Sequence, residues 1–125
     1  GGHTKNLFMK DKNGVIVLIC AHADSELKLN QLHKLTGTRR LSFASGELMV
    51  ELLGVTPGSV TGFALMNDTD GKVRFVVDKA LMAFETLNFH PLVNTGTTAI
   101  PREDFRAFVK ATGHDMTEVD FESLL

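Results

Sequence analysis

The sequence predicts an α/β or α+β fold built on a mixed, largely antiparallel sheet. Short apolar runs occur in pairs around clusters of turn-forming residues, which is typical of strand hairpins. Three other segments place apolar residues three or four positions apart, the spacing of helices that bury one face. Strands and helices follow one another in a mixed order, and this order favours a sheet that is flanked by helices.

The length and composition of the chain suit one domain, with no second domain expected. Its 125 residues are 43% hydrophobic and include nine Phe, enough for a sizeable core. A formal net charge of −2 with 22% charged residues describes an ordinary surface, so any contact with RNA should be local. Because a strand-like run begins so close to Gly1, we expect an upstream N-terminal segment to be missing from this chain.

The first predicted element is a hairpin that leads into a buried strand. Residues 6–10 mix apolar and polar side chains in a strand-like way, residues 11–14 form a turn that ends in Asn-Gly, and residues 15–21 are continuously apolar. Cys20 lies inside this buried run, so it is interpreted as a core residue and not as a nucleophile. It is the only cysteine and cannot form an internal disulfide; with no signal peptide or membrane-length apolar stretch, a cytoplasmic protein is expected.

Two helices should follow the hairpin. The first carries Leu32 and Leu35 on one face and ends at Gly37. The second begins after Ser45, a residue type that caps helix N-termini, and ends at Gly54. Its predicted core stripe is Met49, Leu52 and Leu53.

Two adjacent arginines, Arg39 and Arg40, lie between these helices. A pair of arginines can contact RNA phosphates, but it can equally form an ordinary solvated surface. The sequence leaves both interpretations open.

A second hairpin is predicted in the middle of the chain. Residues 63–66 and 72–78 are its expected strands, with residues 67–71 as the turn. Asp68 and Asp70 lack the spacing of a calcium-binding EF-hand loop, so they are expected to stabilise the turn. The remaining predictions are a short helix over residues 79–84, strands over 87–89, 97–100 and 116–121, and a helix that starts at Pro101, buries Phe105, Phe108 and Val109, and closes with Lys110 and Gly113.

One polar segment, residues 88–98, lies between apolar runs and is too rich in turn formers for a core strand. Pro91 favours an extended backbone at His90, and Gly96 adds conformational freedom. Such a segment is able to surround a small polar ligand. It is equally able to be a plain connection whose side chains satisfy their own backbone. The side chains available for either role are Asn94, Thr95, Thr97 and Thr98.

Four stretches, in this order, resemble the YbaK/prolyl-tRNA-synthetase-associated editing domain family, and most closely its free-standing members. They are His3-Thr4-Lys5-Asn6-Leu7-Phe8-Met9-Lys10-Asp11, the loop at residues 58–61, the run at 63–68 and the polar segment at 88–98. The resemblance extends from residue 2 to about residue 121. It implies a curved mixed sheet, partly closed like a barrel and flanked by helices, with a pocket between sheet and helices.

The resemblance also implies a deacylase that hydrolyses the ester of mischarged Ala-tRNA(Pro). Lys5 would hold the terminal phosphate or orient the 3′ end, and Asn6 and His90 would hydrogen-bond the ribose or the amino acid. Backbone groups and the ribose hydroxyl would position the water, so no Ser or Cys nucleophile is needed. The catalytic residues implied are Lys5, Asn6, Gly58 and His90, and the substrate-binding residues are Ser59, Phe63, Leu65, Met66, Asn94 and Thr95. Lys5 has no obvious ion-pair partner nearby, except for Asp11.

Alternatives to this activity remain open: a deacylase of Cys-tRNA(Pro) or Ser-tRNA, or a non-catalytic module that binds tRNA or a synthetase. The expected partners are the acceptor end of a mischarged tRNA and prolyl-tRNA synthetase, with the protein a monomer or a homodimer and no membrane contact. The five histidines lack metal-binding spacing, and no nucleotide-binding or nucleophile-elbow motif occurs, so neither a metal nor a cofactor is expected.

A departure from the family pattern occurs at Gly62. The family's Gly-x-x-x-Pro loop matches at Gly58, but Gly62 stands where the proline is expected. Glycine at this position predicts a more mobile loop, and we would then expect Gly62→Pro to be tolerated.

Overall fold

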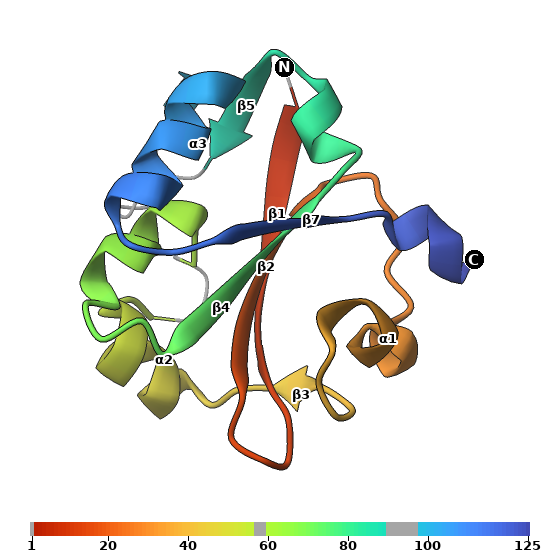
Figure 1. Cartoon of the computed structure of the whole chain (residues 1–125), viewed down its shortest axis with the longest axis vertical. Helices are drawn as coiled ribbons and strands as arrows, with labels where there is room; N and C mark the ends of the chain where they lie inside the picture. Colours follow the sequence, from red (N-terminus) through yellow and green to blue (C-terminus); the bar gives the residue numbers. More distant parts are fainter. Residues whose placement is uncertain (1, 57–59, 90–97) are drawn as a thin grey trace.

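A seven-stranded mixed sheet forms the centre of the molecule (Figure 1). The computed structural model describes residues 2–56, 60–89 and 98–125. The strand order is β6-β5-β1-β2-β4-β7, with β3 paired to β1. The strands are β1 (Gly2–Lys10), β2 (Ile16–His22), β3 (Ser42–Phe43), β4 (Val73–Asp78), β5 (Thr86–Phe89), β6 (Thr98–Pro101) and β7 (Met116–Val119).

Antiparallel and parallel pairings are balanced between these described strands. β1 pairs antiparallel with β2 and with β3, and β5 pairs antiparallel with β6. The pairings β1 with β5, β2 with β4 and β4 with β7 are parallel. The mixed sheet and the first hairpin are therefore confirmed, and parallel pairing contributes more than the sequence indicated.

The predicted second hairpin is wrong. Residues 63–66 belong to a 3-10 helix, η2 (Gly62–Asn67), whose preceding residue Thr61 accepts a hydrogen bond at its side chain from the backbone N–H of Phe63. A short apolar run has no period that separates strand from helix, and here tertiary packing decides. Asp68 has the predicted turn role, because its carboxylate accepts the backbone N–H groups of Lys72 and Val73.

The predicted caps at Ser45, Gly37 and Gly54 are confirmed. Ser45 Oγ accepts the backbone N–H of Leu48 at 3.1 Å, and Gly37 and Gly54 end their helices with φ of 68° and 66°. The left-handed φ at these two positions favours glycine. The helices are α1 (His33–Thr36), α2 (Gly46–Leu53) and α3 (Arg102–Ala111), with the 3-10 helices η1 (Leu29–Gln31), η3 (Leu81–Ala83) and η4 (Phe121–Leu124).

Both faces of the sheet are covered, and each carries its own apolar cluster. Leu18 and Cys20 of β2 contribute to the cluster under α2, η2 and α3, whereas Val17 and Ile19 contribute to the cluster that includes Leu32 and η4. Figure 1 shows α2 and α3 on one side of the strands and α1 with the C-terminal helix on the other. Strand alternation therefore assigns each β1 side chain to one of these two faces. None of the described helices combines the length and apolar character needed to span a bilayer.

Gly62 is closely packed against an aromatic side chain. A Cβ at this buried position would lie 2.9 Å from Phe105 Cζ and 3.2 Å from Cε1. The expected tolerance of Gly62→Pro does not fit this packing, because proline also carries a Cβ.

We expect Gly62→Ala to lower the free energy of unfolding by about 1 to 3 kcal/mol, as overpacking does. Denaturant unfolding measures this, and Phe105→Leu in the same chain should recover part of the loss. An unchanged unfolding midpoint in Gly62→Ala would show that the ring of Phe105 moves aside for the added Cβ without a loss of stability.

Candidate active site

The candidate site begins with an interruption in the pairing of β1. One edge of β1 pairs with β2 along residues 4–10. On the opposite edge, β5 pairs with Gly2 and His3, and β3 pairs with Met9 and Lys10. Between them, residues 5–7 have no strand partner on this edge among the described strands. We call this stretch the β1 gap, and it contains Lys5 and Asn6.

Hydrogen bonds close both ends of the β1 gap. The hydroxyl of Thr4 donates to the backbone carbonyl of Asn88 at 3.0 Å, and the backbone N–H of Ala44 donates to the carbonyl of Phe8 at 2.9 Å. The opening is therefore about three residues long. Backbone groups of successive strand residues point to alternate edges, so within this stretch the N–H and C=O of Asn6 face the gap and are available to a polar ligand.

A hydrogen bond to the turn that follows β2 holds the side chain of Lys5 in place. Its Nζ donates to the backbone carbonyl of Ser25 at 2.5 Å. The turn that carries Ser25 is itself fixed by Asp78, whose carboxylate accepts the Ser25 hydroxyl and the backbone N–H of His22. Asp11, the partner considered from the sequence, instead accepts backbone N–H groups elsewhere. An ammonium group has three donors, so this contact leaves Lys5 able to bind an anion.

Asn6 faces the opposite side of the sheet from Lys5, since consecutive strand residues alternate. It lies on the same face as Phe8, whereas Lys5 shares the face of Met9. The Oδ1 atom of Asn6 is buried and has no hydrogen-bond partner among the described residues. An unsatisfied buried acceptor costs about 1 to 3 kcal/mol, and a bound ligand that donates a hydrogen bond would offset this cost.

Four phenylalanines pack together on the Asn6 face. The ring centroid of Phe63 lies 5.0 Å from that of Phe89 and 5.2 Å from that of Phe108. The ring centroids of Phe89 and Phe105 lie 4.8 Å apart, with the ring planes tilted by 31°. Phe89 directly follows Asn88, the residue that closes one end of the β1 gap, so this aromatic cluster begins beside the gap. The sequence singled out Phe63 as a wall residue but did not place Phe89 against it, because the contact depends on β5.

The other two wall candidates differ in burial. Leu65 is fully buried in the same core, whereas Met66 is 50% exposed. These residues belong to the 3-10 helix η2 and not to the strand that the sequence predicted. The remaining predicted site residues lie outside the described residues, and their roles stay predictions. They are Gly58, Ser59, His90, Asn94 and Thr95.

A thiol nucleophile is excluded by the surroundings of Cys20. The side chain is fully buried, and burial, together with the charge of Asp78, raises the pKa of its thiol far above the ordinary value. Within the described parts of the chain, no three His, Cys, Asp or Glu side chains come close enough to hold a metal ion. What the described residues offer is a cation, an amide and open backbone groups, which suit the positioning of a polar, anionic ligand.

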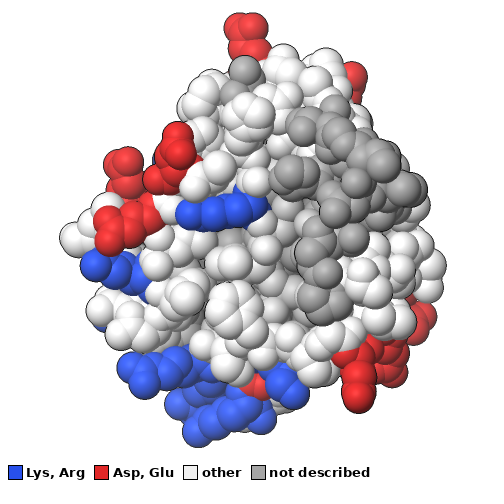
Figure 2. Space-filling view, turned by 180° about the vertical axis from the view of Figure 1, so that it is seen from behind, with Lys and Arg blue, Asp and Glu red and all other residues white. Residues whose placement is uncertain are grey.

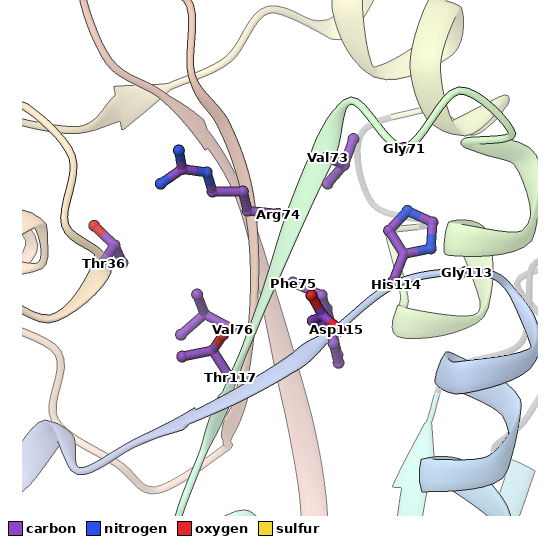
Figure 3. A pocket seen from close by; sticks show the side chains of 10 residues that line it. All are labelled: Thr36, Gly71, Val73, Arg74, Phe75, Val76, Gly113, His114, Asp115 and Thr117. Carbon is purple, nitrogen blue, oxygen red and sulfur yellow. The ribbon is translucent and has the colours of Figure 1, made fainter.

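A separate cavity of about 340 Å³ lies along β4 and β7 (Figure 3). Arg74 points toward Thr36 on one side of it, and His114 lies on the other side. In the sheet order, β2 stands between this cavity and β1, and its lining contains none of the predicted site residues. It is therefore distinct from the β1 gap.

Comparison with known proteins places this arrangement in a family. Residues 1–108 match the model of the aminoacyl-tRNA editing domain. The chain is 41% identical over 128 residues to the bovine (Bos taurus) prolyl-tRNA synthetase associated domain-containing protein 1, covering 98% of this chain and 74% of that protein. It is 33% identical over 117 residues to the prolyl-tRNA editing protein ProX of Acetoanaerobium sticklandii, covering 93% of this chain and 71% of that protein.

Solved structures agree on the fold. The chain is similar to the crystal structure of a candidate trans-editing enzyme for prolyl-tRNA synthetase, with a TM-score of 0.68 and 17% identity over 94% of this chain and 69% of the other. A protein described as hypothetical gives a TM-score of 0.70 with 24% identity over 94% of this chain and 73% of the other. The match of the family model over most of the sequence and the identity to its relatives lead to one assignment: the chain belongs to the aminoacyl-tRNA editing domain family.

Proposed function

We propose that this protein hydrolyses, in trans, the ester bond of alanine mischarged on tRNA(Pro). The observation that carries the proposal is the β1 gap, where a tethered cation and a buried amide oxygen lie beside a stretch of strand edge; among the described residues, neither that oxygen nor that edge has a partner. Membership of the editing family and the similarity to ProX support tRNA(Pro) as the substrate class.

Each residue of the site has a proposed part in holding the 3′ end of the tRNA. Lys5 neutralises the terminal phosphate, and Asn6 Oδ1 accepts a hydrogen bond from the ribose hydroxyl or from the ammonium group of alanine. His90 is proposed to bond the ribose or the amino acid as well. Backbone groups of Gly58 and Ser59 and the side chains of Asn94 and Thr95 complete the proposed site.

The reaction is a direct attack of water on an activated ester. Water adds to the ester carbonyl, the bond between that carbon and the ribose oxygen breaks, and the ribose oxygen takes up a proton. The products are free alanine and uncharged tRNA. Positioning of the water and the ester supplies the rate enhancement, so a covalent intermediate with the protein is not required.

Selection between alanine and proline is proposed to depend on size. Phe63, braced by Phe89 and Phe108, is the proposed rigid wall, with Leu65 behind it in the core and Met66 at its exposed margin. A rigid apolar wall rejects a ring that does not fit, whereas one extra methylene in an adaptable pocket changes binding by only about 1 to 3 kcal/mol. Alanine is therefore accepted and proline is excluded.

A panel of aminoacylated tRNAs incubated with the pure protein tests the proposal. Release of alanine from Ala-tRNA(Pro) well above the buffer rate, with Pro-tRNA(Pro) spared, is the expected pattern. Faster release of cysteine or serine would instead assign one of the related specificities. Binding without release would favour a non-catalytic module that binds tRNA or prolyl-tRNA synthetase. That second candidate is favoured by the animal relatives, which are named only as synthetase-associated domain proteins.

Asn6→Leu should separate function from stability. Leucine has a similar size and removes the unsatisfied acceptor, so we expect the free energy of unfolding to stay the same or to rise by about 1 kcal/mol. We expect kcat/KM for Ala-tRNA(Pro) to fall at least about tenfold, because a hydrogen bond to the substrate is lost. Thermal unfolding and steady-state kinetics measure the two effects. Asn30→Leu at an exposed position is the control, and full activity in Asn6→Leu would exclude Asn6 from the site.

A further inference from the structure

A second polar site lies at the other end of β1. A cavity of about 430 Å³ is lined by Lys12, His33, Thr38, Arg39 and Arg40, and we call it the basic pocket. Figure 2 shows Lys and Arg side chains gathered at the end of the molecule that carries the β1–β2 turn. The whole chain has a net charge of −2, so this concentration of cations is local and is not a general property of the surface.

A buried carboxylate joins the two segments that form the basic pocket. Asp11 Oδ1 accepts the backbone N–H groups of Asn13 and Val15, both at 2.9 Å, and its Oδ2 accepts that of Arg39 at 3.0 Å. Burial opposes ionisation of Asp11, but these backbone donors and the charge of Arg74 outweigh it and hold its pKa below the ordinary value. Asp11 thus fixes the turn that carries Lys12 beside the loop that carries Arg39.

The cations of the basic pocket are not used by the fold. None of the ion pairs between described residues includes Lys12, Arg39 or Arg40, and all three residues are exposed. The carboxylate of Asp11 bonds backbone N–H groups and is only 5% exposed. In addition, Nδ1 of His33 is buried without a partner among the described residues. The pocket therefore presents several donors and a positive field to an anion.

The spacing between the two sites sets the length of a ligand that would occupy both. Six residues separate Lys5 from Asp11 along an extended strand, which corresponds to roughly 20 Å at about 3.4 Å per residue. A single ligand that reaches both sites must be a long polyanion. Building on the proposed function, we propose that the basic pocket binds backbone phosphates of the same RNA whose 3′ end enters the β1 gap. Contacts of this kind position the substrate without reading its sequence.

Two substrates of different length test the proposal. One is Ala-tRNA(Pro), and the other is alanine esterified to the ribose of a single adenosine nucleotide, which is too short to span both sites. For the double variant Arg39→Ala/Arg40→Ala, we expect kcat/KM to fall about tenfold on the tRNA and to stay unchanged on the nucleotide ester. The slope of log affinity for uncharged tRNA against log salt should decrease by about 1 to 2, since each lost phosphate contact removes up to about 0.9.

Matched variants complete the design. The control Lys72→Ala/Lys110→Ala removes two exposed cations elsewhere and should leave both substrates and the salt slope nearly unchanged. Arg39→Lys/Arg40→Lys should recover most of the tRNA affinity, because the charge is kept. Equal losses on both substrates, or no loss on tRNA, would overturn the basic pocket as an RNA site. If the wild-type protein hydrolyses neither substrate, the proposed function fails, and the salt slope for uncharged tRNA still decides the basic pocket.

Discussion

Replacement of Lys5 with alanine is expected to slow single-turnover deacylation of Ala-tRNA(Pro) at least about a hundredfold, which is roughly 2.7 kcal/mol of transition-state stabilisation. The ammonium group is already placed by the carbonyl of Ser25 and still has donors for a phosphate. Its loss should therefore disturb the position of the ester as well as the affinity for the tRNA. Because Lys5 is only partly buried, the free energy of unfolding should fall by no more than about 1 kcal/mol.

Three comparisons sharpen the Lys5 experiment. Lys5→Arg keeps the charge but changes the shape of the donor group, and only part of the activity should return. Lys72→Ala removes an exposed lysine that is far from the β1 gap in the chain, and it should have no effect on the rate. Measurement at saturating enzyme removes the contribution of weaker binding. A rate close to that of the wild type in Lys5→Ala would remove Lys5 from the catalytic residues.

His114→Ala should lower the free energy of unfolding by about 3 kcal/mol. His114 Nε2 lies 2.7 Å from Asp68 Oδ2, and these side chains are 3% and 2% exposed. The hydroxyl of Thr112 lies 2.8 Å from Nδ1 on the other side of the ring. Alanine would leave the carboxylate of Asp68 buried with only its two backbone donors, those of Lys72 and Val73.

A double-mutant cycle isolates the His114–Asp68 pair. Asp68→Ala combined with His114→Ala should cost clearly less than the sum of the two single variants, because each partner is destabilising mainly when left alone. His3→Ala at an exposed position is the control. Chemical denaturation of the four proteins gives the values. A loss below about 1 kcal/mol in His114→Ala would show that water replaces the histidine.

Local signals predicted the parts of the fold that depend on neighbours in sequence. The first hairpin follows from the Asn13-Gly14 turn, and α2 follows from its Ser45 cap and Gly54 end. The middle of the chain could not be predicted in this way. The run at residues 63–66 suits either a strand or a helix, and the contact of Gly62 with Phe105 joins segments that only the tertiary fold brings together.

The sequence named candidate side chains for the site, but it could not give their geometry. Lys5 and Asn6 were identified by resemblance, and alternation along β1 shows that they approach the β1 gap from opposite faces. The tether of Lys5 to Ser25 and the bracing of Phe63 by Phe89 depend on long-range contacts that leave no local pattern. The unsatisfied oxygen of Asn6 is likewise visible only once the surroundings are folded.

The pairing around β1 also has a consequence for the order of folding. The β1–β2 hairpin closes over a short turn, and such hairpins form within about 1 to 10 μs. The parallel pairing of β1 with β5 instead joins the two ends of a loop that contains most of the chain, so its closure carries a larger entropic cost and comes later. Lys5 and Asn6 therefore lie on an element that is expected to form early, and β5, which bounds one end of their site, is expected to pair later. During that interval the part of the β1 edge that β5 later covers is open to pairing with a second chain.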